Sequence, residues 1–165
     1  MASTMPALLS PAHIALVDSG ISAIVASRNA DLLPSIMRAI GTQISPDGQL
    51  ITVFLRASQS AQLLADIATC GPIAVVFSDP ASNRTVQVKS GSARIRPATP
   101  GDQAVLRRYL LSLQHLISQV GYGPDYVAAM LSAPAHDVVA LEFTPEAAFD
   151  QTPGPHAGTP LPSRP

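Results

Sequence analysis

Residues 34–91 read PSIMRAIGTQISPDGQLITVFLRASQSAQLLADIATCGPIAVVFSDPASNRTVQVKSG, and this stretch decides the fold. Two apolar runs, 34–45 and 49–57, flank the tripeptide Pro46-Asp47-Gly48. Proline presets φ for a turn, and glycine accepts a positive φ. The sequence therefore predicts two antiparallel strands joined by a tight turn.

The hydrophobic period changes after the second of these runs. Leu63, Leu64, Ile67 and Ala68 fall on one face of a helix that spans 60–70, and Gln62 and Asp66 fall on the opposite face. Gly71-Pro72 ends this helix. A continuous apolar strand is expected at 73–78, and an alternating strand at 85–89.

The flanking sequence predicts further strands and helices. Residues 13–18 and 21–28 are short apolar runs around Ser19-Gly20, which favours a hairpin of two strands. A capping pattern at Thr99-Pro100 opens a long amphipathic helix. A shorter helix at 124–131 and a strand at 138–143 follow.

At least six strands joined mostly by short turns, with three helices, indicate a mainly β protein. We expect an antiparallel barrel of six to seven strands with helices packed outside. Residues 1–150 form one domain in this prediction. Residues 151–165 form a tail rich in Pro and Gly, extended on the surface or on a partner.

The composition of the 165 residues favours a buried homodimer interface. Hydrophobic residues reach 47% and charged residues only 13%, about half the usual share of roughly 25%. A compositional bias towards alanine and proline is the alternative explanation. The net charge of −1 gives no electrostatic footprint for nucleic acid.

Cysteine content and hydropathy indicate the compartment. Cys70 is the only cysteine, which suits a reducing cytoplasm. No apolar stretch approaches the roughly 20 residues that span a bilayer. We expect a soluble, cytoplasmic protein that contacts no membrane.

A candidate binding site lies where residues 52–60 pass from strand to helix. Arg56 ends the strand, and Ser58, Gln59 and Ser60 form a polar turn before the helix. Free N–H groups at a helix start, together with an arginine, can bind a phosphate. Alternatively, Ser58 or Ser60 only caps the helix.

Two further polar residues lie on neighbouring strands. Arg38 can bind a phosphate or be an ordinary solvent-facing residue. Gln87 shares a strand face with Thr85 and Lys89, which is either a cleft wall or the wet face of a sheet. The four histidines show no metal-ligand spacing, and no nucleophile motif identifies a catalytic residue.

Three segments carry a family resemblance: 58–77, Arg84 to Gly91, and Phe149-Asp150-Gln151-Thr152-Pro153-Gly154-Pro155. With them the chain resembles the pyridoxamine 5′-phosphate oxidase-like superfamily, the flavin-binding split β-barrels. The second and third segments are similar to a bacterial subgroup of flavin-binding proteins. The resemblance implies a homodimer with flavin mononucleotide (FMN) in a cleft between the subunits.

The resemblance also assigns residues. It implies that Arg38, Arg56, Ser58, Gln59 and Ser60 hold the FMN phosphate, and that Gln87 reaches the flavin ring. Oxidases of the superfamily usually carry an Arg-Lys pair in the turn, where this chain has Gln59-Ser60. They also carry a lysine at the end of the third strand, and residues 39–42 hold none.

The function expected from the resemblance is FMN binding. If the protein is an enzyme, the resemblance implies a flavin-dependent oxidoreductase of unknown substrate. The alternative is a non-catalytic dimer that binds a flavin, another cofactor such as a deazaflavin or haem, or a small metabolite. A structural dimer with a vestigial cleft is the third alternative. The tail either covers the cleft across the dimer or is an ordinary disordered terminus.

Overall fold

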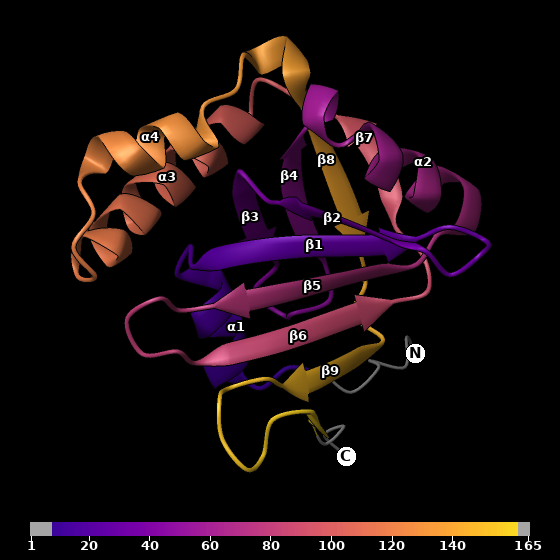
Figure 1. Ribbon diagram of the computed structural model, residues 1–165, viewed down its shortest axis with the longest axis horizontal. Helices are drawn as coiled ribbons and strands as arrows, with labels where there is room; N and C mark the ends of the chain where they lie inside the picture. The colour runs from indigo at the N-terminus through magenta and orange to yellow at the C-terminus, as the bar shows by residue number, and fades with distance from the viewer. Residues whose placement is uncertain (1–7, 162–165) are drawn as a thin grey trace.

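The computed structural model describes residues 8–161, which fold into two antiparallel sheets with peripheral helices (Figure 1). One sheet has six strands in the order β10-β9-β6-β5-β1-β2, and the other has four in the order β3-β4-β8-β7. The strands are β1 Ser22–Arg28, β2 Pro34–Arg38, β3 Gly41–Ile44, β4 Ile51–Arg56, β5 Ile73–Ser78, β6 Thr85–Ser90, β7 Arg94–Pro97, β8 Val138–Phe143, β9 Ala147–Asp150 and β10 Thr159–Pro160. The expected antiparallel barrel is confirmed, with more strands than the six or seven predicted.

Two of the extra strands arise because the chain changes sheets within a predicted run, and the other two are β9 and β10, where no strand was predicted. The N–H of Ala39 donates to Ala23 in the six-stranded sheet (3.0 Å), and the N–H of the next residue, Ile40, donates to Phe54 in the four-stranded sheet (2.8 Å). The run 34–45 is therefore split into β2 and β3. After β6 the chain likewise leaves the six-stranded sheet, because β7 pairs with β8.

The helices are α1 Pro11–Asp18, α2 Ala61–Cys70, α3 Asp102–Ser118 and α4 Pro124–Leu131, with 3₁₀ turns η1 Ala57–Gln59 and η2 Ala135–Asp137. The prediction of a strand at 13–18 was wrong. Ser10 accepts a hydrogen bond from the N–H of His13, and Pro11 occupies the first turn of α1. This capping favours a helix, and the short apolar run fits either secondary structure.

The core between the sheets is built from alternate residues of each strand. On β4, Ile51, Val53 and Leu55 enter this core. Phe54 points the other way, into a second cluster under α3 and α4. At Gly41 on β3, an added Cβ would lie 2.6 Å from a methyl group of Leu106. Glycine thus lets α3 approach the four-stranded sheet closely.

Helix α2 packs against the inner face of the six-stranded sheet, at β1 and β2. Asp66, which the sequence placed opposite the apolar face of this helix, is nevertheless buried. Its carboxylate accepts hydrogen bonds from Ser35 of β2 (2.6 Å) and from Gln62 (2.7 Å). A buried carboxylate with hydrogen-bond donors is tolerated, and it fixes α2 to β2.

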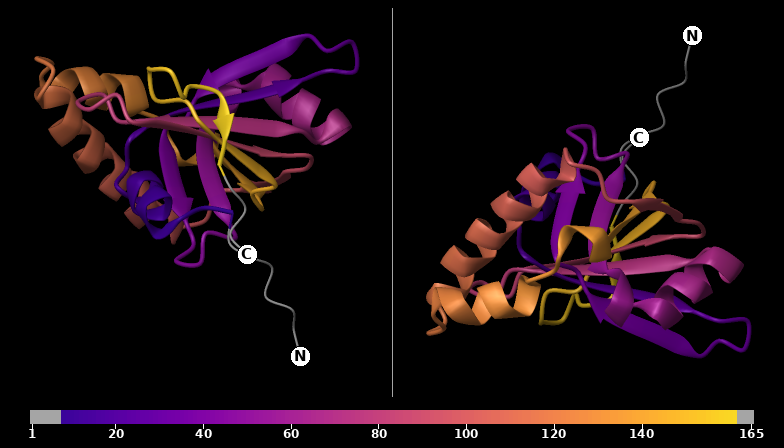
Figure 2. Two further views of the ribbon diagram at one scale, coloured as in Figure 1. Left: turned by 90° about the horizontal axis from the view of Figure 1, so that it is seen from below. Right: turned by 90° about the horizontal axis from the view of Figure 1, so that it is seen from above.

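The outer face of the six-stranded sheet carries no helix from the described residues. In Figure 1, β5 and β6 lie in front of α1, and Figure 2 shows α3 and α4 beside the four-stranded sheet. The chain therefore covers one sheet and leaves the outer face of the other open.

The described part of the tail, 151–161, folds back onto the six-stranded sheet. The N–H of Gln151 donates to Thr85 (2.9 Å), and the N–H of Leu161 donates to Ala148 (2.8 Å). Thr159 and Pro160 form β10 beside β9. This part of the tail extends the sheet edge within its own subunit.

Candidate cofactor-binding face

The uncovered outer face of the six-stranded sheet is called the open face here. The alternation of the strands and their register place on it Ser22, Ile24, Ala26, Arg28, Pro34, Ile36, Arg38, Ala74, Val76, Ser78, Thr85, Gln87, Lys89, Ala147 and Phe149. Their strand neighbours, such as Val25, Val75 and Val88, are fully buried on the other side. The alternation expected for β6 is confirmed.

The two predicted site residues on the open face lie in one cross-strand row. The register pairs Arg38 with Ile24, Ile24 with Val76, Val76 with Gln87, and Gln87 with Phe149. Three strand spacings separate the backbones of Arg38 and Gln87, or about 14 Å. Between them lie only aliphatic side chains, so the row is an apolar strip with a polar residue at each end.

Gln87 sits between apolar and polar partners. Its Oε1 accepts a hydrogen bond from the Gln151 side chain at 3.4 Å. Thr152 accepts a hydrogen bond from the N–H of Thr85 (3.0 Å). The tail segment that carried the family resemblance therefore contacts the start of β6. The Lys89 ammonium lies 4.9 Å from the Phe149 ring centre.

Arg38 is held at the other end of the row, next to α3. Its guanidinium donates to the Ser22 hydroxyl (2.7 Å). The nearby Tyr109 ring is buried, and desolvation raises the pKa of its hydroxyl to about 12, against opposing effects of the Ala23 backbone and the Arg38 charge. The hydroxyl itself lacks a hydrogen-bond partner of good geometry. The Arg38 guanidinium is thus held against the open face by its hydrogen bond to Ser22.

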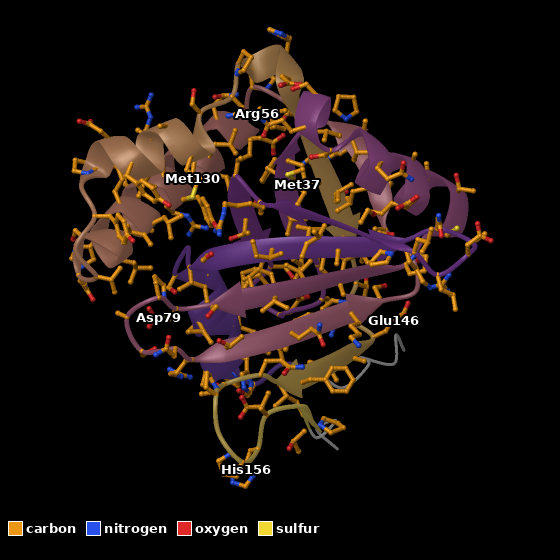
Figure 3. The ribbon with its side chains drawn as sticks, viewed as in Figure 1. Met37, Arg56, Asp79, Met130, Glu146 and His156 are labelled. Carbon is orange, nitrogen blue, oxygen red and sulfur yellow. The ribbon has the colours of Figure 1, made fainter. Side chains whose placement is uncertain are left out.

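The four residues of the predicted phosphate turn lie at the end of β4, away from the tail at His156 (Figure 3). The N–H of Ser58 donates to one carboxylate oxygen of Asp137 (2.7 Å), and its hydroxyl donates to the other (2.5 Å). These hydrogen bonds lower the pKa of Asp137, and the charge of Arg56 acts in the same direction. The donors expected for a ligand phosphate therefore already bind an anion of the protein.

The other turn residues offer little more. The Ser60 hydroxyl is buried and donates to the Arg56 carbonyl (2.7 Å), so it neither caps α2 nor faces a ligand. Gln59 is exposed. The Nε of Arg56 is buried and has no hydrogen-bond partner, so this arginine keeps an unused donor.

Arg38 ends β2 in the six-stranded sheet, and Arg56 ends β4 in the four-stranded sheet, near the point where the chain passes from β2 to β3. Arg38 precedes Ile40 by two residues, Arg56 follows Phe54 by two, and Ile40 bonds to Phe54. Arg38 nevertheless turns onto the open face, while Arg56 pairs with Val138 in the four-stranded sheet. The predicted site thus divides into Arg38 with Gln87 on the open face, and the 56–60 turn elsewhere.

Sequence reasoning missed Asp137, Ser22, Gln151 and Phe149 as neighbours of the predicted residues. Gln151 lies in the segment that carried the family resemblance, which was a usable signal. Asp137 had none, since it is 79 residues from Ser58 and belongs to no recognisable motif.

Two hollows adjoin these regions. One of about 370 Å³ opens at the end of the open face, where Arg28, Pro34, Ala74 and Lys89 are among its lining residues. Another of about 380 Å³ lies between α3 and α4 and contains none of the predicted site residues. The first has the size of a small-ligand site and two cationic walls.

Comparison with known proteins identifies the fold. HupZ of Group A Streptococcus superimposes with a TM-score of 0.57 at 16% identity, over 91% of this chain and 99% of the other. A Lactobacillus delbrueckii protein assigned as a pyridoxamine 5′-phosphate oxidase gives 0.56 at 14% identity, over 90% and 97%. This chain shares its split β-barrel fold with these two proteins.

An F420 reductase has the same fold, with a TM-score of 0.59 at 15% identity, over 85% of this chain and 98% of the other. By sequence, no family model and no curated protein matches this split barrel. At these identities the likeness extends to the fold, and the ligand has to be argued from the site.

Two absences concern residues 8–161. Within that range, no three His, Cys, Asp or Glu side chains gather as metal ligands. No helix in the same range is long and apolar enough to cross a bilayer.

Proposed function

We propose that this split barrel binds a flavin cofactor, FMN as the expected form, on the open face between two copies of the chain. The observation that carries the proposal is the row from Arg38 to Phe149. An apolar strip suits the faces of a planar ring, and Gln87 offers an amide to the polar edge of that ring.

Two solved neighbours support a ring of this class. One is assigned as a pyridoxamine 5′-phosphate oxidase and another is an F420 reductase. Both share the fold of this chain at low identity, so their names suggest the ligand class without fixing it.

A second copy of the chain is the proposed cover for the open face. Ile36 is 67% exposed there, and Leu32, at the tip of the β1–β2 hairpin, is also 67% exposed. A standard interface buries about 800 Å² on each partner, and the outer face of a six-stranded sheet can supply such an area. The low charge content of the chain is consistent with this burial.

Bound flavin would supply hydride chemistry, which makes a flavin-dependent oxidoreductase the enzyme form of the proposal. The chain's own residues would bind and orient the ring: Gln87 through its amide, and Arg38 through its charge near the edge of the strip.

A non-catalytic binding protein is the second candidate, and a specific observation favours it. The strand residues of the open face include no Asp, Glu, His or Cys. A general acid or base must lie within hydrogen-bonding reach of the reacting atoms. Storage or sensing of the cofactor requires no such group.

The test is the absorption spectrum of the purified protein, followed by titration with FMN and riboflavin. A flavin spectrum, or saturable quenching of flavin fluorescence, is expected. Val76→Glu would place an unpaired charge in the strip and should abolish both flavin binding and dimerisation. Fluorescence titration measures the binding, and light scattering measures the dimer. A protein that ignores both flavins, or a monomer that binds them normally, would overturn the proposal.

A further inference from the structure

The 56–60 turn contains its own anion, held in place by the sheet. Val138 pairs with Arg56 in the register of β4 and β8, so the residue before it, Asp137, is delivered directly beside the turn. Both carboxylate oxygens are used there: one by the N–H of Ser58 at 2.7 Å, the other by its hydroxyl at 2.5 Å. This two-point contact reproduces the way a turn grips one edge of a phosphate.

The negative charge of Asp137 opposes the binding of a second anion at this turn. The hydrogen bonds from Ser58 keep the pKa of Asp137 below its usual value, so the carboxylate stays ionised at neutral pH. The charges of Arg56 and His136 act on it in the same direction. A phosphate dianion placed at this turn would meet an ionised carboxylate and would share a single arginine with it, and like charges at such distances repel.

The remaining side-chain donors of the turn do little to compensate for Ser58. The Nε of Arg56 is unbonded but buried, and the charge of Arg56 already acts on Asp137. The Ser60 hydroxyl is committed to the Arg56 carbonyl (2.7 Å). A flavin phosphate therefore does not fit the turn while Asp137 remains in place.

We propose that Asp137 is a specificity residue that occupies the turn in place of a ligand phosphate, so that the phosphate contributes no affinity there. The ligand class is thus a flavin-type ring recognised on the open face irrespective of a phosphate at the 56–60 turn. This inference rests on the proposed function for the ring, and it opposes the phosphate role that the family resemblance gives to Ser58.

The first experiment removes the Ser58 hydroxyl and leaves Asp137 in place. Ser58→Ala should leave the dissociation constant of FMN unchanged, because the hydroxyl serves Asp137 and not the ligand. If FMN binds about tenfold more weakly to Ser58→Ala while riboflavin does not, which is the loss of one charge-assisted hydrogen bond, the turn holds the phosphate and the inference is wrong.

The second experiment removes the internal anion. Asp137→Ala should raise the affinity for FMN relative to riboflavin by about tenfold or more, since it frees the Ser58 donors and removes the repulsion. Asp125→Ala is the matched control: it deletes an exposed carboxylate of α4 that makes no ion pair within the described residues. The same gain in Asp125→Ala would show that only net charge matters, and would contradict the inference.

The third experiment needs no flavin and separates this inference from the proposed function. In ¹⁵N-labelled protein, the amide signal of Ser58 should ignore inorganic phosphate at neutral pH and respond to it saturably in Asp137→Ala. If the wild-type signal responds to phosphate, or the variant signal does not, Asp137 does not control the site. A protein that binds neither flavin but shows the expected phosphate response would sink the proposed function and leave the role of Asp137 intact.

Discussion

The outer faces of the two sheets differ: helices cover the face of the four-stranded sheet, and solvent contacts the face of the six-stranded sheet. On the four-stranded sheet, Phe54 is fully buried under α3 and α4, and Arg96 joins Asp102 and Glu142 at one edge. On the six-stranded sheet, the corresponding outward side chains remain in contact with solvent. Helices α3 and α4 thus cover the outer face of one sheet only. The comparison teaches that the covered face supplies stability, whereas the open face is available for a ligand or a second subunit.

A matched pair of phenylalanines provides the largest test of this comparison. Phe54→Ala should destabilise the fold by about 3–5 kcal/mol, because it leaves a cavity under α3 and α4. Phe149→Ala should cost much less in dilute protein, since Phe149 lies on the open face and is only partly buried. Denaturant unfolding at several protein concentrations measures both.

The concentration dependence sharpens that test. If a second copy covers the open face, the cost of Phe149→Ala will grow with protein concentration while that of Phe54→Ala will not. Equal costs for the two variants at every concentration would show that the two faces do not differ in the way described.

A smaller effect is expected at the edge of the covered face, where Asp102 bonds to two guanidinium nitrogens of Arg96 at 2.7 and 3.0 Å. These bonds lower the pKa of Asp102 from 3.8 to about 2. Asp102→Asn should therefore cost roughly 1.5–3 kcal/mol at neutral pH. The control is Asp18→Asn, whose exposed bridge to Arg108 (3.1 Å) is worth about 0–1 kcal/mol.

The pH dependence of this prediction has a definite sign. A carboxylate with a lowered folded pKa adds stability that is complete above its unfolded pKa and is lost as pH falls through the folded value. The stability difference between wild type and Asp102→Asn should therefore persist above pH 3.8 and shrink as pH falls towards about 2. A difference that stays constant over this range would exclude the ion pair as its cause.

The smallest effect concerns the open face itself. Gln87→Ala should weaken flavin binding by about 0.5–1.5 kcal/mol, or roughly two- to tenfold, if its amide bonds to the ring. Gln43→Ala, an exposed glutamine of the four-stranded sheet, serves as the control in the same fluorescence titration. Equal effects of the two substitutions would remove Gln87 from the proposed site.

Much of the fold could be predicted because the relevant signals are local. The turn at Pro46-Asp47-Gly48 forms as expected, with Gly48 at φ +71°, and β3 and β4 pair antiparallel around it. The helix predicted at 60–70 and the alternation of β6 also formed. Failures occurred where two local readings were equally possible, as at 13–18, where a capped first turn outweighed a strand-like apolar run.

The candidate site was less accessible to prediction than the fold. Arg38 and Gln87 were selected separately, and the cross-strand row that contains both appears only when β2, β1, β5 and β6 are placed side by side. The buried Asp66 shows the same limitation, since its partner Ser35 lies on a strand 31 residues away.

The sequence by itself determined the turn at 46–48, the helices α2, α3 and α4, and the alternation of side chains along β6, because these depend on φ, ψ and the spacing of neighbouring residues. Only the tertiary structure decided which polar groups still have free donors. Ser58 is a ready phosphate ligand in the sequence, but closure of the barrel brings Asp137 to it from 79 residues away. A donor is available only if the folded chain has not already satisfied it, and that depends on distant pairing.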